Sequence, residues 1–264
     1  MNPMQLQTLT HFGRLVGSGL VAFAGVLLAL SSSSYAATVH VAVASNFTAP
    51  LKIIAAEFER VSGHTVVTSS GSTGKLYSQI KNAAPFDVFL AGDDATPARL
   101  QADGLGVANT RFTYAVGRLA LWSADASLVD AKGEVLKAGK FSRLALASPK
   151  AAPYGMAAIE TLRKLDLMNA LEPKFVTGES IAQAYSFVAS GNAPLGFVAL
   201  SQVMENGQLK SGSMWLVPTQ LHTPLKQDAV LLTPARSNPA AIAFMKFLQA
   251  DGSRAIIRSF GYEI

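Results

Sequence analysis

Between residues 39 and 104 the chain alternates between short β-branched runs and segments whose apolar residues recur at helical spacing. Residues 39–43 have the alternation of a strand, and Leu51, Ile54 and Phe58 then lie on one face of a predicted helix. Two further pairs follow, with strands at 64–69 and 86–90 and helices that begin near residues 76 and 96. Because the connections are short, this order predicts a mostly parallel sheet with helices on both faces.

The same alternation starts again near residue 118. The predicted strands of this second block lie at 118–122, 143–147, 195–200 and 214–217, and its helices lie at about 128–138, 154–165 and 181–189, with a short helix that Gly207 ends. A strand at 229–232 and a helical stretch that starts at Asn238-Pro239 complete the chain. Two successive α/β blocks indicate two lobes rather than a single sheet.

The boundaries between the lobes are predicted at two stretches, 111–117 and 218–226. We expect the chain to leave lobe one at the first stretch and to return at the second. Lobe one would then contain residues 37–117 plus 222–264, and lobe two residues 118–221. A ligand would lie in the cleft between the lobes, outside the carboxyl ends of the strands.

Residues 1–36 have the three-part order of a secretory signal peptide. The first 14 residues contain Arg14 and no acid, the run 15–30 is apolar apart from glycines and Ser18, and Ser34 and Ala36 occupy the small-residue positions before a cleavage site. We expect cleavage after Ala36 and a periplasmic mature chain. An uncleaved membrane anchor is the alternative, but the apolar run is short beside the ~20 residues of a typical span.

Composition narrows the chemistry further. The 264 residues include no cysteine, which excludes disulfides, thiolate metal sites, cysteine nucleophiles and a lipid-modified cysteine. An exported chain of this length without disulfides depends on its hydrophobic core. The formal net charge of +5 is spread along the chain without a Lys/Arg run, so nucleic acid is not an expected partner. After residue 36 no segment is apolar enough to cross a bilayer.

Small hydroxyl residues and two glycines mark the strand-to-helix corner at residues 69–76. Such a corner presents backbone N–H groups and hydroxyls at the positive end of a helix dipole, which suits a small anion. A P-loop needs four residues between its first glycine and the Gly-Lys pair, whereas two separate Gly71 from Gly74, and no Ser or Thr follows Lys75. The alternative is an ordinary serine-rich helix cap without a ligand.

Four predicted corners share this chemistry. They are Ser45-Asn46, Ser72-Thr73, Pro153-Tyr154 and Ser180-Ile181. All offer neutral donors, and Lys75 is the one basic side chain near them. A dianion would be held there by hydrogen bonds and dipoles, each bond to a charged acceptor contributing ~1.5–3 kcal/mol. One corner alone is typical of a simple helix cap, but four on the same side of the sheets indicate an anion site.

Five ordered motifs carry a resemblance to a known family. They lie at residues 41–47, 71–80, 84–93, 152–155 and 193–200. With these motifs the chain resembles the molybdate-binding periplasmic proteins of ABC importers, which belong to the type II solute-binding proteins. The resemblance covers residues 37–264. It implies an α/β fold of the two-lobed periplasmic binding protein type II, each lobe a mostly parallel sheet flanked by helices, with the ligand cleft between the lobes.

The resemblance also implies the ligand-binding residues. By position they are Ser45, Asn46, Ser72, Thr73, Tyr154 and Ile181. The family's hydroxyl contact falls on Thr73, and its neighbour Ser72 is the alternative. Ile181 would contribute mainly its backbone N–H. Some family members use a tyrosine where this chain has Ala199, so the chain resembles the branch that uses Asn46 and the Pro-Tyr-Gly corner instead.

Other chemistries find weaker support in the sequence. Asp87, Asp93 and Asp94 have no EF-hand spacing, and the last two are expected to cap the following turn rather than bind Mg²⁺ or Ca²⁺. No HExxH pattern or paired spacing links the histidines that follow residue 36, and a Gly-x-Ser-x-Gly elbow is missing. A periplasmic hydrolase or transferase would need a base near Ser45 or Thr73, and the linear sequence places none there.

The predicted function is therefore that of a non-enzymatic, exported receptor. It would bind molybdate, and tungstate with it, and deliver the ion to the membrane permease of an ABC importer. The interpretation includes a monomeric chain, no cofactor, and no metal other than the molybdenum of molybdate itself. The first alternative is a binding protein for another tetrahedral oxyanion such as sulfate, or for an organic acid; the lack of Arg at the corners speaks against a carboxylate ligand.

Overall fold

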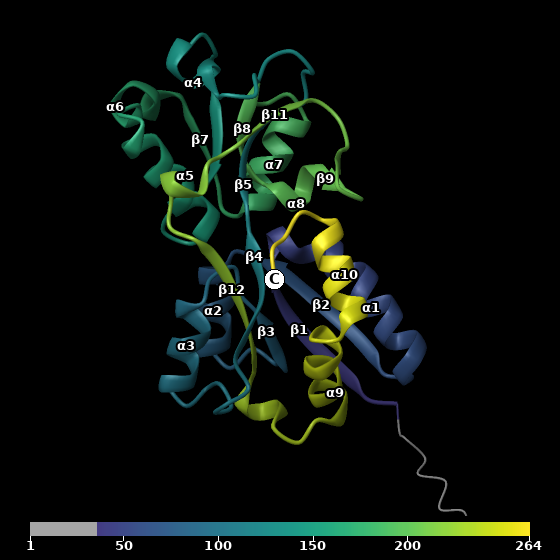
Figure 1. The fold of residues 1–264 in the computed structure, drawn as a ribbon. Coiled ribbons are helices and arrows are strands. Elements are labelled where there is room, and N and C mark those ends of the chain that lie inside the picture. The colour runs from purple at the N-terminus through teal and green to yellow at the C-terminus, as the bar shows by residue number, and fades with distance from the viewer. Residues whose placement is uncertain (1–35) are drawn as a thin grey trace, which may run out of the picture. The chain divides into compact units, whose positions relative to one another are not determined.

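Two five-stranded sheets, each flanked by helices, organise the chain (Figure 1). The structure is a computed structural model that describes residues 36–264, so the predicted signal peptide, apart from Ala36, lies outside the described residues. The first sheet has the order β2-β1-β3-β12-β4 and the second the order β11-β5-β8-β6-β7. The strands of the first sheet are β1 (Thr38–Ala44), β2 (Thr65–Gly71), β3 (Val88–Leu90), β4 (Phe112–Gly117) and β12 (Leu225–Leu231). Those of the second are β5 (Leu119–Ser123), β6 (Leu144–Ala147), β7 (Phe175–Gly178), β8 (Leu195–Ala199) and β11 (Ser213–Leu216).

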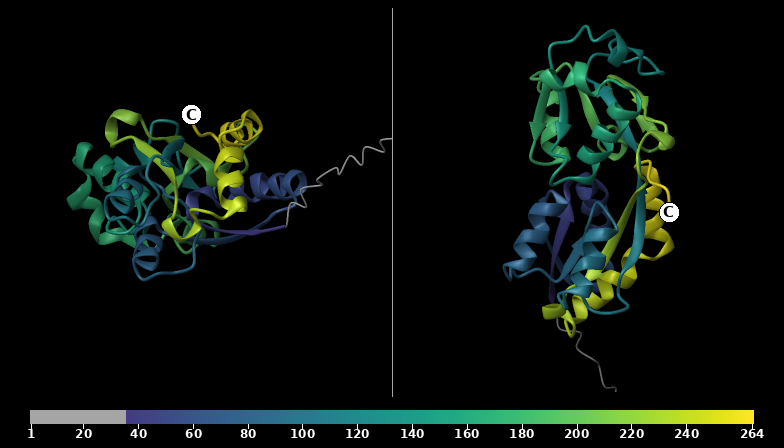
Figure 2. Two further views of the ribbon diagram at one scale, coloured as in Figure 1. Left: turned by 90° about the horizontal axis from the view of Figure 1, so that it is seen from below. Right: turned by 90° about the vertical axis from the view of Figure 1, so that its left-hand side faces the viewer.

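In each sheet one strand runs against the other four. In the first sheet it is β12, which pairs antiparallel with β3 and β4, and in the second it is β5, which pairs antiparallel with β8 and β11. The remaining pairings are parallel. Each reversed strand comes directly after the chain passes from one sheet to the other (Figure 2). The chain passes from β4 through Arg118 to β5, and from β11 through residues 217–224 to β12. The predicted mostly parallel sheets are thus confirmed, with one reversed strand each.

The helices of the first sheet cover both of its faces. On one side lie α1 (Thr48–Ser62), α9 (Pro239–Leu248) and α10 (Asp251–Ser259), and on the other α2 (Thr73–Lys81) and α3 (Ala95–Ala102) (Figure 1). The alternation of β1 explains this division. Val41 and Val43 pack in the core with α1 and α9, whereas Ala42, between them, packs with Leu76 of α2.

The second sheet is covered in the same way. Its helices are α4 (Glu134–Ala138), α5 (Pro153–Lys164), α6 (Met168–Leu171), α7 (Ile181–Ala189) and α8 (Leu200–Val203). Leu119 and Leu121 of β5 belong to the hydrophobic core that includes α5, and Ala120 and Trp122 pack with Val188 of α7. The described residues also contain four short 3-10 turns: η1 (Ser45–Phe47), η2 (Glu172–Lys174), η3 (Thr219–Leu221) and η4 (Thr233–Ala235). Among residues 36–264 no helix has both the length and the apolarity to span a bilayer.

The predicted boundary stretch 111–117 is mostly strand β4, which pairs antiparallel with β12. Two sequence predictions need correction. The predicted helix at 128–138 is reduced to α4, since the Asp130 carboxylate accepts the N–H groups of Lys132 and Val135 and so forms a turn before it.

The segment before Gly207 is the second. The expected helix is only the single turn α8, and β9 (Met204–Glu205) and β10 (Gln208–Leu209) then form a hairpin. Asn206 and Gly207 both have positive φ, as the Asn-Gly turn of a two-residue hairpin requires. The C-terminal helical stretch is divided into α9 and α10.

The chain passes between the two sheets twice, and these two passages divide the strands between them. Strands β1 to β4 and β12 belong to the first sheet, and β5 to β8 and β11 to the second. Residues 36–264 nevertheless form one compact unit. The lobe boundaries at 117/118 and 221/222 therefore stay a prediction.

Candidate functional site

All six residues predicted to bind the ligand line one cavity. The cavity is small, and its lining consists of Ala44, Ser45, Asn46, Gly71, Ser72, Thr73, Ala152, Pro153, Tyr154 and Ile181. The first six residues follow or end strands β1 and β2, and the last four follow strands β6 and β7 of the other sheet. The carboxyl ends of parallel strands from both sheets therefore meet at this cavity, as expected for an α/β ligand site.

Three helices begin at the cavity. Thr73 and Ile181 are the first residues of α2 and α7, and Tyr154 is the second residue of α5. The first N–H groups of a helix have no acceptor within the helix. Those of Thr73, Tyr154 and Ile181 donate to no acceptor elsewhere among residues 36–264. Three sets of free donors, each at the positive end of a helix dipole, thus surround one small space.

The hydroxyl groups at the cavity are engaged to different degrees. The N-cap residue Ser72 is buried, and its hydroxyl forms no hydrogen bond within the described chain. Thr73 Oγ1 accepts the N–H of Gly92 at 2.9 Å, and Ser45 Oγ accepts the N–H of Ala182 at 3.4 Å. Ser72 therefore has the least constrained hydroxyl of the three.

The side chains of Asn46 and Tyr154 point away from the cavity. Asn46 Nδ2 donates to Gln227 Oε1 at 2.8 Å and to Tyr262 Oη at 2.9 Å, which uses both amide protons. The Tyr154 hydroxyl accepts from Gln227 Nε2 at 3.0 Å. What these two residues can offer a ligand is therefore their main-chain N–H. Sequence reasoning missed Gln227, although the adjacent polar pair Gln227-Asp228 in an apolar strand was a visible signal.

The described side chains that line the cavity carry no charge. None of the described residues that line it is Lys, Arg, His, Asp or Glu. Burial raises the pKa of the Tyr154 phenol well above its ordinary value, and it raises the pKa of the neighbouring Tyr262 to about 12. Both phenols are therefore protonated at neutral pH. The positive potential of the site comes from oriented N–H groups rather than from cationic side chains.

Contacts between the two sides close the cavity. The Gly74 N–H donates to the carbonyl of Ala151 at 2.9 Å, and the Ser201 hydroxyl donates to the carbonyl of Asn46 at 2.8 Å. At the rim, Lys75 Nζ lies 3.8 Å from a carboxylate oxygen of Glu179. Both of these side chains are more than half exposed, so their attraction is screened by solvent.

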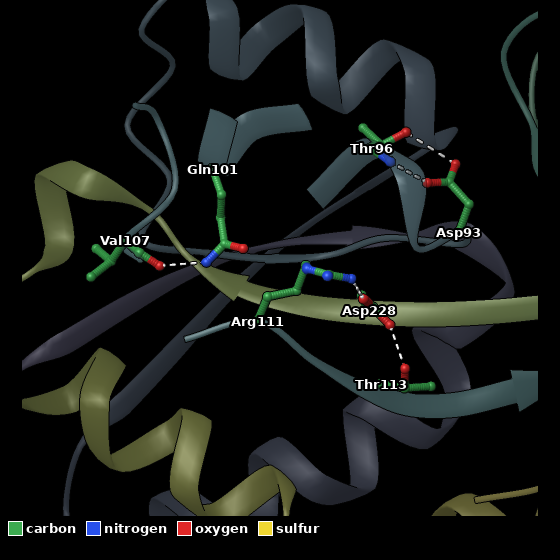
Figure 3. A network of polar contacts seen from close by, with 7 residues as sticks. All are labelled: Asp93, Thr96, Gln101, Val107, Arg111, Thr113 and Asp228. Carbon is green, nitrogen blue, oxygen red and sulfur yellow. Dashed lines mark hydrogen bonds and ion pairs between the residues drawn. The ribbon is translucent and has the colours of Figure 1, made fainter. Parts of the chain in front are cut away.

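The acidic residues considered for a metal have other partners. The Asp93 carboxylate accepts the N–H of Thr96 at 2.7 Å and its hydroxyl at 3.1 Å, which caps the start of α3 (Figure 3). The Asp87 carboxylate accepts the N–H of His40 at 2.7 Å. Asp93 thus caps the following turn, as the sequence predicted, whereas Asp94 forms no such side-chain hydrogen bond within the described chain. Among residues 36–264 no group of three potential metal ligands occurs.

Known proteins are similar to this chain in sequence and in fold. Residues 39–263 match the family described as bacterial extracellular solute-binding protein. The chain belongs to this family. It is 54% identical over 233 residues to the molybdate-binding protein ModA of Azotobacter vinelandii, a match that covers 88% of this chain and 92% of that protein. It is 47% identical over 254 residues to ModA of Rhodobacter capsulatus, covering 96% and 99% of the two chains.

A solved structure agrees with these relatives. The periplasmic molybdate-binding protein of Azotobacter vinelandii superposes with a TM-score of 0.83 at 38% identity, and the match covers 86% of this chain and 99% of that one. The predicted fold, a two-lobed solute-binding protein of type II, is thereby confirmed.

Proposed function

We propose that this protein is an exported receptor that binds molybdate, and tungstate by the same chemistry, and delivers it to the permease of an ABC importer. One observation carries the proposal: free main-chain N–H groups at three helix starts, from both sheets, converge on a cavity without cationic side chains. The ModA relatives, whose printed name is molybdate-binding protein, support the choice of ion.

The donor set favours a particular kind of anion. Every group assigned to the ligand can donate, so a fully deprotonated tetrahedral dianion can accept each bond. Hydrogen phosphate carries an O–H that the main-chain N–H groups cannot accept; a hydroxyl that accepts it must turn its own proton away from the ion, so one bond to the ion is lost at a cost of about 1–3 kcal/mol. Sulfate is also fully deprotonated but smaller, so its rejection depends on the size of the cavity.

The proposed contacts follow from which donors are free. Ser72 would donate its hydroxyl, and Asn46, Tyr154 and Ile181 would donate main-chain N–H groups. Thr73 would contribute its N–H, and its hydroxyl can donate its proton only from the position in which its oxygen accepts from Gly92. Ser45 can donate its proton while its oxygen accepts from Ala182. Bonds to a charged acceptor contribute about 1.5–3 kcal/mol each, which is enough for sub-micromolar binding after the entropic cost of association.

A role in binding rather than catalysis belongs to the same proposal. Ser45 and Thr73 carry the hydroxyls that a hydrolase could use as nucleophiles, but no histidine or carboxylate among the described residues lines the cavity beside them. Periplasmic location, the monomeric state and the absence of a cofactor are further parts of the proposal, and the relatives' names support the first of these.

Isothermal titration calorimetry with a panel of oxyanions tests the proposal. We expect molybdate and tungstate to bind one ion per chain with sub-micromolar Kd, and sulfate and phosphate to bind at least ~100-fold more weakly. Sulfate binding as tight as molybdate binding would contradict the assigned specificity. Absence of binding for every tetrahedral oxyanion would contradict the receptor function itself.

A further inference from the structure

Behind the cavity, six buried polar side chains form a connected cluster. Its members are Asn46, Tyr114, Tyr154, Ser201, Gln227 and Tyr262, and we call them the buried polar cluster. They come from six separate segments, namely η1, β4, α5, α8, β12 and the C-terminal residues. Asn46 and Tyr154 also line the cavity, and the other four do not. The cluster therefore contacts the site from behind, from both sheets.

Gln227 lies at the centre of this cluster. Its side chain is fully buried, and its Oε1 accepts from Asn46 Nδ2 at 2.8 Å and from the Tyr114 hydroxyl at 3.1 Å. Its Nε2 donates to the Tyr154 hydroxyl at 3.0 Å. A single carboxamide thus joins one cavity residue from each side of the site.

The backbone is irregular where Gln227 lies. In the antiparallel pairing of β12 with β4, Gln227 opposes Ala115 and Asp228 opposes Thr113, so that Tyr114 is an extra residue. A bulge of this kind turns a side chain away from its regular direction, and here the Tyr114 hydroxyl meets Gln227.

Beyond the bulge, Asp228 holds β12 in place. Its carboxylate accepts from the Thr113 hydroxyl at 2.7 Å and pairs with the Arg111 guanidinium (Figure 3). Neither of these partners lines the cavity. Asp228 is therefore a buried polar neighbour of Gln227 that serves the strand pairing and not the site.

Gly117, the last residue of β4, leaves room for the contact between Gln227 and Tyr154. A Cβ atom at this position would overlap the Tyr154 hydroxyl and would lie 2.5 Å from Gln227 Nε2. The close approach of the strand to these two side chains is possible because glycine has no side chain.

We propose that Gln227 is a positioning residue for oxyanion binding, which holds Asn46 and Tyr154 so that their main-chain N–H groups face the cavity from opposite sides. Gln227 itself does not touch the ligand. Because water does not reach this buried cluster, breaking one of these hydrogen bonds would leave a polar group unsatisfied. The bonds of Gln227 therefore hold the side chains of Asn46 and Tyr154 in one position. Donors that are held in this way do not have to be ordered when an oxyanion binds. This inference rests on the proposed function.

The main test compares Gln227→Leu with the control Asp228→Asn. Leucine removes all three hydrogen bonds at nearly the same volume, and we expect the Kd for molybdate to rise at least ~10-fold. Asp228→Asn weakens a buried contact in the same strand, so we expect a lower Tm but a Kd within ~2-fold of the parent protein. Equal Kd values for Gln227→Leu and the parent would overturn the proposal, whatever the change in Tm.

Tyr154→Phe provides an independent test, also if Gln227→Leu fails to fold. Phenylalanine keeps the N–H of residue 154 and loses only the hydroxyl that Gln227 contacts. We expect a Kd increase of ~3-fold or more, and a smaller increase overturns the proposal.

Where both single variants fold, the double variant adds a readout that a purely structural role would not change. Because Gln227→Leu already removes the contact that Tyr154→Phe breaks, we expect Tyr154→Phe to raise the Kd by less than ~2-fold on the background of Gln227→Leu. Independent, multiplying effects would contradict the proposed coupling.

Parallel titration of the parent protein separates this inference from the proposed function. If the parent binds molybdate and both single variants bind it equally well, the positioning role of Gln227 is wrong and the receptor function stands. If the parent binds no oxyanion, the proposed function is wrong, and the inference fails with it.

Discussion

The two sides of the cavity offer different kinds of hydrogen-bond donor. The side formed by the first sheet presents the hydroxyls of Ser45, Ser72 and Thr73 in addition to main-chain groups. The other side offers main-chain N–H groups alone, because the Tyr154 phenol contacts Gln227 and the Ile181 side chain packs in the hydrophobic core. Side-chain identity thus matters directly on the first side. On the second, what matters is where a helix begins.

Ile181→Pro is the strongest test of this difference. Proline is tolerated at the first position of a helix, and Ser180 before it is extended, with φ −141° and ψ 167°, as a residue before proline should be. The substitution therefore removes one N–H from the cavity with little change to α7. Loss of a bond to a charged acceptor of up to about 3 kcal/mol predicts a Kd increase of about 100-fold by calorimetry.

Ile181→Ala is the matched control. It removes most of the buried side chain but keeps the N–H, so we expect a lower Tm and a Kd within about 3-fold of the parent protein. If alanine weakened binding as much as proline, the main-chain contact would not be the important one.

Ser72→Ala is expected to have the next largest effect. It deletes the one hydroxyl at the cavity that forms no hydrogen bond within the described chain, and a water molecule can partly replace it. We predict a Kd increase of about 10-fold, measured by the same titration.

Thr73→Val is the comparison for Ser72→Ala. Here the main loss is the acceptor of the Gly92 N–H, which should lower the free energy of unfolding by about 1 kcal/mol and raise the Kd by less than Ser72→Ala does. The reverse order of the two Kd values would assign the hydroxyl contact to Thr73.

The fold and the cavity lining were predictable because their signals are local. Ser-Asn, Ser-Thr or Pro-Tyr after a strand indicates that a helix begins there. Parallel strands bring such helix starts to the same edge of the sheet. The roles within the site were not predictable. Asn46 bonds to Gln227 and Tyr262, which lie 181 and 216 positions away in the sequence, so only the folded chain shows that its amide points away from the cavity.

The same reason explains the errors in the fold. Residues 112–117 were named only as a lobe boundary, and they form a strand because β12, more than one hundred positions later, pairs with them. Local polar signals were also misread: the Asp130 turn shortened a predicted helix, and the Asn206-Gly207 pair made a hairpin.

Binding should depend little on pH. Since no Lys, Arg, His, Asp or Glu is among the described residues that line the cavity, we predict Kd values for molybdate within about 3-fold between about pH 6 and 9. A steeper change in calorimetric titrations would reveal a titrating group in contact with the ion.

Stability should instead fall at alkaline pH. Burial raises the pKa of Tyr262 to about 12 and that of Tyr154 well above its ordinary value of 10. The folded protein therefore holds these protons when the unfolded chain has released them, and the stabilisation is lost as pH rises through the interval between about 10 and 12. Chemical denaturation at several pH values above neutral would show the decrease, and a flat profile would contradict it.

The smallest effect is expected at the rim. Lys75 and Glu179 lie on opposite sides of the cavity, but both are largely exposed and their charged atoms are 3.8 Å apart. We predict that Lys75→Ala changes the Kd by less than about 2-fold at physiological salt, with Glu179→Gln as the matched variant. A large loss with Lys75→Ala alone would mean that a cation, rather than neutral donors, holds the ion.

Anomalous diffraction at the molybdenum edge from crystals grown with molybdate tests the central claim most directly. We predict one strong peak in the cavity, with ligand oxygens about 2.7–3.2 Å from Ser72 Oγ and from the main-chain nitrogens of Tyr154 and Ile181. No Lys, Arg or His nitrogen should lie within that distance of the ion. A peak in another part of the protein, or a cationic side chain against the oxyanion, would contradict binding by neutral donors at converging helix starts.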